Sequence, residues 1–469
     1  MVTRLSASDA SFFHLENSST PMYVGSLSIL RKPRSGLSYE TLLATVEQRL
    51  PQIPRYRQKV REVTLGLARP VWIDDRDFDI TYHIRRSALP SPGSDAQLHE
   101  LIARLGSRQL DKTRPLWEMY LVEGLARSRL AIYTKTHQAL VNGMTALEIG
   151  HVIADRTHKP PAFGEDIWIP SREPGDTRLL MGAVGEWIAR PGAQLAAVRT
   201  AVSEVATNSG QLLEVGRRAA DVARTFARGN APSSPLNTTV SRNRRFTVAS
   251  GRLEDYRSLR ARYDCDVNDV VLAVIAGALR NWLMSRGEPV APTATVRAMA
   301  PMSVYPDAEL DSTGPGQAIS EVSPFLVDLP VGEGNAVVRL SQIAHATESH
   351  PTAASLVDAR TIVTLSGFAP PTLHAMGIRV ATTFSARQFN LLITNVPGAQ
   401  KQMYVAGTKL LETYAVPPLL NNQVLAIGVT SYDGMLYYGI NADRDAMSDV
   451  DVLPTLLRES LDELLEAAQ

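Results

Sequence analysis

A proline-rich break between residues 158 and 176 divides the chain and constrains its fold more than any other feature. The segment reads HKPPAFGEDIWIPSREPGD, and each proline removes a backbone donor and disfavours helix in the residue before it. Before the break, apolar residues recur at helical spacing over 39–53 and 96–110, whereas 116–125 and 129–137 have the composition of strands. This alternation predicts a mixed α/β lobe.

The residues after the break predict a helical connector and a linker. Residues 177–229 place apolar side chains at helical spacing beside several arginines. Two interpretations fit this pattern, namely helices that pack on the lobes and a helix that contacts a lipid surface. The Pro-, Ser- and Asn-rich segment 229–245 is then typical of a linker.

A second lobe is expected from Phe246 onward. The pattern predicts helices over 255–262 and 268–286 and strands near 389–396, 424–431 and 435–441. At 469 residues the chain is also too long for one hydrophobic core. We therefore predict an N-terminal lobe over 1–165, a helical connector and linker over 166–245, and a C-terminal lobe over 246–469.

Charge and cysteine content argue against several classes of protein. Lys plus Arg and Asp plus Glu both number 48, so we expect no nucleic-acid partner. Cys265 is the single cysteine, which fits a reducing cytoplasm. The N-terminus lacks the apolar core of a signal peptide, and the apolar run 270–279 is shorter than the roughly 18–20 residues of a membrane span. We expect a cytoplasmic protein, with peripheral contact at the inner membrane or at lipid droplets as a further possibility.

The sequence also lacks the motifs of several familiar enzymes. It contains no GxSxG, HExxH, GxxxxGK[ST] or GxGxxG pattern. The remaining chemistry needs neither a metal nor a tightly held cofactor, and it includes acyl transfer from an activated thioester to an alcohol. That reaction requires a base for the hydroxyl proton and hydrogen-bond donors for the oxyanion.

His137 is the candidate base, because it alone among the nine histidines closes a strand-like run beside a Gly-containing turn. The stretch THQALVNG, residues 136–143, could present this side chain over a cleft. A lone histidine is more often structural, and this alternative stays open.

Four motifs in order raise the case for acyl transfer. They are RPLW with Pro115, Leu116 and Trp117; THQALVNG; VNDVVLAVIAGALR with Asn268 and Asp269; and LLITNVPG with Asn395. Together with LSASDASFFHLE near the N-terminus and LYYGINADRDAMSD near the C-terminus, they resemble the wax ester synthase/diacylglycerol acyltransferase family, particularly its mycobacterial members. Each motif alone has a structural explanation, as a strand entry, a helix N-cap or a turn.

The resemblance implies two α/β lobes like those of the CoA-dependent acyltransferases, with a tunnel at their interface and the histidine loop midway. Long-chain acyl-CoA would enter from one side, as co-substrate without any other cofactor, and diacylglycerol or a fatty alcohol from the other. Pro115, Leu116 and Trp117 would bind substrate, as would Asn268, Asp269 and Asn395. A closed tunnel would also protect the thioester from water.

The sequence departs from the family motif at its centre. The motif reads HHxxxDG with the second histidine as base, and this chain has His137, Gln138, Asn142 and Gly143 in the aligned positions. A glutamine takes up no proton near neutral pH, and adjacent strand residues face opposite sides. His137 could still reach the tunnel if the strand end bulges. Asn142 keeps a hydrogen bond but loses the charge of the aspartate, and Asn-Gly still favours a turn.

Three functions follow from these residues. The first is acyl-CoA-dependent synthesis of triacylglycerol, with wax esters as a further product and with a rate lowered by Gln138. The second is a non-catalytic protein that binds acyl-CoA or neutral lipid in the tunnel. The third is a structural protein of the lipid-storage surface. The first requires His137 to face the tunnel, and the second requires Gln138 to line it with His137 turned into the lobe.

Overall fold

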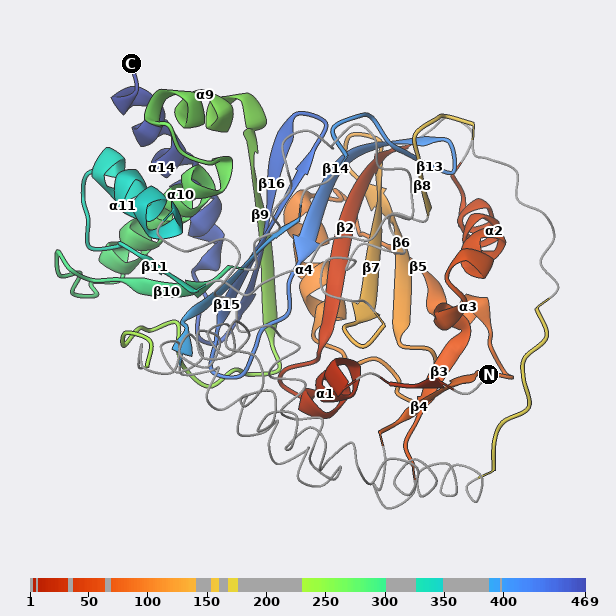
Figure 1. Cartoon of the computed structure of the whole chain (residues 1–469). Helices are drawn as coiled ribbons and strands as arrows, with labels where there is room; N and C mark the ends of the chain where they lie inside the picture. The colour runs from red at the N-terminus through yellow and green to blue at the C-terminus, as the bar shows by residue number, and fades with distance from the viewer. Residues whose placement is uncertain are drawn as a thin grey trace, which may run out of the picture.

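The computed structural model describes residues 3–5, 7–32, 37–63, 69–140, 153–159, 168–175, 230–300, 326–348, 388–396 and 399–469. Within these residues the strands form three sheets, and helices cover them to give two mixed α/β lobes (Figure 1). The predicted connector helices over 177–229 lie outside the described residues, as do Asn142 and Gly143.

The first lobe is built on a seven-stranded sheet in the order β5-β6-β7-β2-β14-β13-β8. Its strands are β2 (Tyr23–Arg31), β5 (Ile84–Ala88), β6 (Trp117–Leu125), β7 (Arg129–His137), β8 (Ala154–Asp155), β13 (Tyr404–Val405) and β14 (Thr408–Val416). The central pair, β2 and β7, is antiparallel over nine residues each. Both strands that the sequence predicted here, 116–125 and 129–137, are confirmed.

Among the described residues, four helices and a small sheet accompany this seven-stranded sheet. The helices are α1 (Ala7–Leu15), α2 (Tyr39–Arg49), α3 (Ile80–His83) and α4 (Asp95–Gly106), with 3₁₀ turns η1 (Leu50–Gln52) and η2 (Pro54–Arg57); the small sheet contains β1 (Thr3–Arg4), β4 (Val71–Asp74) and β3 (Gln58–Arg61). α4 begins at a capping box, in which the side chains of Ser94 and Gln97 each bond the other residue's backbone N–H. The predicted helices over 39–53 and 96–110 are thus confirmed, with shorter C-terminal ends.

The second lobe is built on a six-stranded sheet in the order β11-β10-β12-β15-β16-β9. The strands are β9 (Arg244–Arg252), β10 (Val296–Met299), β11 (Leu326–Leu329), β12 (Leu391–Val396), β15 (Leu425–Tyr432) and β16 (Met435–Asp443), and the helices are α9 (Leu253–Tyr263), α10 (Val267–Ser285), α11 (Ala336–Glu348) and α14 (Leu453–Ala467), with the 3₁₀ turn η4 (Val450–Val452). The helices and strands predicted for the second lobe are confirmed within a few residues.

α10 is the central helix of the second core. Residues 270–276 and 278–279 are all buried, and the helix packs against α14 and α11. Gly277 permits this packing, because a Cβ at that position would lie 2.1 Å from Ser460 Oγ. By length and composition α10 could also cross a membrane, but 72% of its most apolar window is buried inside the lobe. Burial in the core accounts for its apolar sequence.

Two strands from the C-terminal part of the chain lie in the first sheet, a connection that the predicted division into lobes did not include. β14 pairs with β2, so residues about 385 positions apart lie side by side (Figure 1). Where β14 crosses the second sheet, Ala415 packs on the paired glycines Gly428 and Gly439. A Cβ at Gly439 would lie 1.7 Å from the carbonyl oxygen of Ala415. These glycines allow the two sheets to approach closely.

Candidate active site

His137 is the last residue of β7, as the sequence predicted, and it is completely buried. It pairs with Tyr23 of β2, and its backbone N–H donates to the carbonyl oxygen of Leu116 at 2.9 Å. The imidazole Nδ1 accepts a hydrogen bond of 3.0 Å from the backbone N–H of Ala139. The histidine therefore orders the turn that follows its own strand.

The other imidazole nitrogen of His137 faces a buried carboxylate. Nε2 lies 3.9 Å from Oε2 of Glu16, whose side chain is 1% exposed, and no described residue forms a hydrogen bond with Nε2. Lys112 Nζ lies 2.9 Å from the same carboxylate oxygen. Sequence reasoning missed Glu16 and Lys112, although Glu16 closes the LSASDASFFHLE stretch.

Burial keeps His137 neutral. Desolvation, with a smaller contribution from Lys112, lowers the pKa of His137 to about 3. Because Nδ1 accepts from Ala139, the neutral ring carries its proton on Nε2, toward Glu16. Nδ1 is therefore engaged by the backbone, and in this arrangement the lone pair of the ring is not free to accept a substrate proton. The assignment of His137 as base stays a prediction, and it requires the turn to rearrange.

Gln138 follows the end of β7 and is half-buried. Its backbone N–H donates to the carbonyl oxygen of Met22 at 2.9 Å, whereas its side-chain amide has no hydrogen-bond partner among the described residues. Gln138 lies in the turn just beyond β7, and only a continued strand alternation would direct its side chain to the Thr134 face, opposite His137. On the Thr134 face a small cavity of about 60 Å³ is lined by hydroxyl-bearing and apolar side chains of both sheets, including Ser26, Met403 and Tyr432.

The histidine loop is anchored at both ends. Asn142 and Gly143 lie outside the described residues, but the chain re-enters the sheet at β8. There Asp155 accepts two hydrogen bonds of 2.7 and 2.9 Å from the Nη2 of Arg49 on α2, and both side chains are buried. The backbone bonds at residues 137 and 138 hold the other end.

Pro115, Leu116 and Trp117 form a buried support for His137. Leu116 supplies the carbonyl that accepts from His137, and Trp117 begins β6. The indole N–H of Trp117 donates to the carbonyl oxygen of Tyr56 at 2.8 Å, and its ring stacks on His83 at 4.7 Å. The structure thus gives this motif packing contacts, and its role in substrate binding stays a prediction.

Two motifs that are far apart in the sequence meet in the second lobe. The side-chain amide of Asn395, on β12, donates to the Oδ1 of Asn268 in the first turn of α10. Asp269 has a structural role as well, because it accepts from the backbone N–H of Asp266 at 2.9 Å and from the Thr347 hydroxyl at 2.7 Å. Burial raises the pKa of Asp269. A substrate contact for these three residues stays a prediction.

The fold defines the class of protein. Over 99% of this chain, it matches the wax ester synthase/diacylglycerol acyltransferase from Marinobacter aquaeolei VT8, with a TM-score of 0.68, 24% identity and 100% of that chain covered. The first condensation domain of the CDA synthetase matches with a TM-score of 0.56 at 13% identity, over 100% of this chain and 97% of that one. The protein therefore has the two-lobed fold shared by these acyltransferases and condensation domains, as the sequence predicted.

The sequence comparisons identify the family. The wax ester synthase/diacylglycerol acyltransferase catalytic domain matches residues 5–271, and the WS/DGAT C-terminal domain matches residues 321–465. The chain belongs to this family.

Two relatives from Mycobacterium tuberculosis H37Rv illustrate the similarity. The "Probable diacyglycerol O-acyltransferase tgs3" is 77% identical over 266 residues, which cover 57% of this chain and 98% of that protein. The "Probable diacyglycerol O-acyltransferase tgs1" is 30% identical over 99% of this chain and 96% of that protein.

Proposed function

We propose that the protein is an acyl-CoA-dependent O-acyltransferase that makes triacylglycerol from diacylglycerol and long-chain acyl-CoA, with wax esters as products when a fatty alcohol is the acceptor. One observation carries the proposal. The catalytic-domain match over 5–271 includes the Pro115–Trp117 motif, His137 and the Asn268–Asp269 motif in order. The names of the tgs1 and tgs3 proteins support diacylglycerol as the acceptor.

The site favours a slow transferase. Gln138 can orient a substrate through its amide but takes up no proton, and the lone pair of His137 is bonded to Ala139. Loss of general-base catalysis typically costs about 10²–10⁴-fold, whereas positioning of two substrates can contribute on the order of 7–11 kcal/mol. A site that retains positioning can therefore still catalyse transfer.

The experiment is a transfer assay with purified protein, radiolabelled long-chain acyl-CoA and either diacylglycerol or a long-chain alcohol. We expect labelled triacylglycerol in proportion to protein, above the rate without enzyme. We also expect activity to survive treatment with a chelator, because the proposed reaction uses no metal. Product at the level of the control with both acceptors would contradict the proposal.

A second candidate function is favoured by the engaged His137 and by Gln138. It is a non-catalytic protein that binds acyl-CoA or neutral lipid. Equilibrium binding of acyl-CoA by the protein, together with no transfer to either acceptor, would establish this function.

We further propose a cytoplasmic protein with peripheral contact at the inner membrane or at lipid droplets. The amphipathic pattern over 177–229 supports this location, and it also motivates a third function at the lipid-storage surface. Fractionation of cells should recover the protein in soluble and lipid-associated fractions, and high salt should release the associated part. Recovery only in the soluble fraction would contradict the peripheral contact.

A further inference from the structure

A cleft of about 850 Å³ lies between the two lobes, away from the small cavity beside β7. α4 of the first lobe forms one wall, and the start of β9 with Arg444 and Asp451 forms the other. Its volume is within the range of pockets that bind nucleotides and other small ligands. We refer to this space as the interlobe cleft.

The interlobe cleft is rich in arginine, although the whole chain has no net charge. Five arginines line it against two carboxylates, Glu100 and Asp451. Arg245 pairs with Asp451. The cleft therefore keeps a local excess of positive charge after its internal ion pair is counted.

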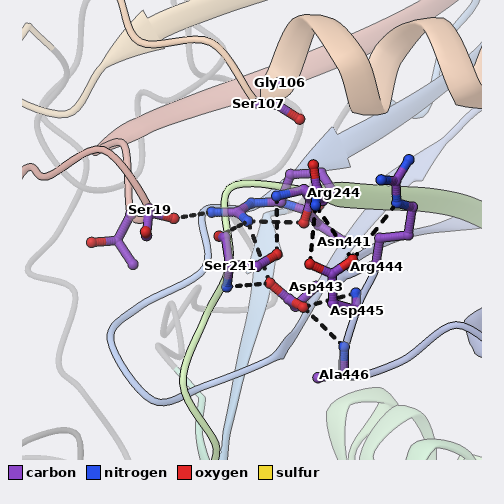
Figure 2. Close-up of polar contacts among 12 residues, drawn as sticks. Ser19, Gly106, Ser107, Ser241, Arg244, Asn441, Asp443, Arg444, Asp445 and Ala446 are labelled. Carbon is purple, nitrogen blue, oxygen red and sulfur yellow. Dashed lines mark hydrogen bonds and ion pairs between the residues drawn. The ribbon is translucent and has the colours of Figure 1, made fainter.

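Arg244 holds the two lobes in place and forms the base of this region. Its guanidinium donates to the carbonyl oxygens of Ser241 and Asn243 in the second lobe and to that of Ser19 in the first, beside the buried Asp443 (Figure 2). Because these contacts occupy Arg244, this residue shapes the cleft and leaves other arginines to bind a ligand.

Arg104, Arg108 and Arg444 are the cations that remain at the rim, and all three are exposed. Within the described part of the chain, the side chains of Arg104 and Arg108 have no hydrogen bond or ion pair. Among the same described residues, the side chain of Arg444 has only a contact of 3.9 Å with the exposed Asp445. Two of these arginines belong to the first lobe and one to the second, an arrangement that fits an anion held between the lobes.

We propose that the interlobe cleft binds the phosphate groups of the CoA nucleotide through Arg104, Arg108 and Arg444. The inference rests on the proposed function, since the ligand is the nucleotide end of the acyl-CoA substrate. Guanidinium groups bind phosphate oxygens in a bidentate manner, and several of them suit a ligand with a diphosphate and a further phosphate. Ala103 and Phe246 add an apolar surface that suits a flat purine ring.

The distance to the histidine turn fits this assignment. Ser19 accepts from Arg244 at the cleft, and Met22 accepts from the backbone N–H of Gln138. Three peptide units separate these two contacts, so Ser19 and Met22 are at most about 11 Å apart along the chain. An extended pantetheine arm is longer than this span. The contact at Ser19 therefore lies within the length of such an arm from the Met22 contact with the turn.

The test is the binding of CoA and of acyl-CoA to the full-length protein, measured by calorimetry. The double variant Arg104→Gln/Arg108→Gln is expected to weaken the affinity for both by roughly 10–100-fold, because hydrogen bonds to charged groups are lost. Arg257→Gln/Arg458→Gln is the matched control, since it removes the same charge from the exposed surfaces of α9 and α14, outside the cleft. This control is expected to bind CoA like the unmodified protein.

Kinetics with two donors give the second readout. With acyl-CoA, the Arg104→Gln/Arg108→Gln variant should raise KM by roughly 10–100-fold and leave kcat within about twofold. With the acyl thioester of N-acetylcysteamine, which has no phosphate, the variant should match the unmodified protein. An equal loss of activity with both donors would overturn the proposal. An unchanged affinity of the variant for CoA would also overturn it, and so would weaker binding to anionic vesicles while CoA binding stays unchanged.

These outcomes separate the inference from the proposed function. If the protein binds acyl-CoA through these arginines but transfers no acyl group, the nucleotide site is supported and the transferase function fails. If the protein transfers acyl groups and the variant binds CoA normally, the nucleotide site fails and the transferase function is supported.

Discussion

At the residue scale, His137 and Gln138 are adjacent in the sequence, but their side chains lie in different environments. His137 is turned into the first lobe, where Ala139 donates to its Nδ1 and the Glu16 carboxylate lies 3.9 Å from its Nε2. Gln138 lies in the turn just beyond the strand, and its side chain is half-buried. The sequence predicted that a histidine would close this strand, but it left the direction of the ring open because strand alternation weakens at a strand end. Glu16 was missed because its contact with His137 arises only in the folded lobe.

Substitution of His137 distinguishes a base from a residue that positions the turn. Asparagine can still accept from the N–H of Ala139 but takes up no proton, whereas alanine does neither. In the observed arrangement we expect His137→Asn to retain kcat within about tenfold of the unmodified protein, and His137→Ala to lose substantially more activity and thermal stability. If His137 is the base, both variants should lose about 10²–10⁴-fold in kcat. An equal loss of that size in the two variants would contradict the positioning role.

The lowered pKa of His137 also predicts a dependence of stability on pH. The group titrates near 6.5 when unfolded and near 3 when folded, so the unfolded state binds the extra proton first as the pH falls. The stabilisation is complete above pH 6.5 and is lost progressively toward pH 3. From this histidine alone, we expect a loss of about 2 kcal/mol in the free energy of unfolding between pH 6.5 and 5. Denaturant unfolding of His137→Asn should show a loss that is smaller by that amount. If the free energy of unfolding falls equally in both proteins between pH 6.5 and 5, the lowered pKa of His137 is refuted.

At the element scale, local patterns predicted most helices and strands of both lobes. Apolar spacing located α4 and α10, and strand-like composition located β6 and β7. The insertion of β13 and β14 into the first sheet could not be predicted in this way, because pairing between distant segments leaves no local period. The contact of Asn395 with Asn268 was not predicted, because the resemblance to the family implied only that both residues bind substrate.

The buried ion pair that anchors β8 to α2 should contribute strongly to stability. Asp155→Ala leaves the Arg49 guanidinium buried without its carboxylate, which typically costs about 3–5 kcal/mol. Asp255→Ala is the control, since it removes the partly buried partner of the exposed Arg252 and should cost less than about 1 kcal/mol. The midpoints of thermal unfolding should separate the two variants clearly. A shift in Asp155→Ala no larger than that in Asp255→Ala would show that the pair does not anchor the loop.

The crossing of β14 over the second sheet depends on the absence of a side chain at Gly439. Gly439→Ala places a methyl group against the backbone of Ala415, and overpacking of this kind typically costs about 1–3 kcal/mol or more. Gly334→Ala provides the control, because its new methyl group would meet only the guanidinium of Arg280 at 3.5 Å. We expect a lower melting temperature for Gly439→Ala alone. Equal melting temperatures would mean that the sheets can separate at this point without cost.

At the scale of the whole molecule, three features lie where the two lobes meet. β14 extends the first sheet from the C-terminal part of the chain, Arg244 bonds residues of both lobes, and the interlobe cleft lies between α4 and β9. The overall fold could be predicted because four ordered motifs resemble one family. The interlobe cleft could not, because its arginines come from segments about 140–340 residues apart and have no common spacing.

The central claim, that the protein is an acyltransferase slowed by the glutamine at position 138, is tested most directly by Gln138→His. The substitution restores the imidazole of the family motif at position 138. In parallel assays of triacylglycerol formation, we predict a measurable kcat for the unmodified protein and a kcat about 10²-fold higher for Gln138→His, near the lower end of general-base contributions. If the unmodified protein forms no more triacylglycerol than the control without enzyme, or if Gln138→His is no faster, the claim is contradicted.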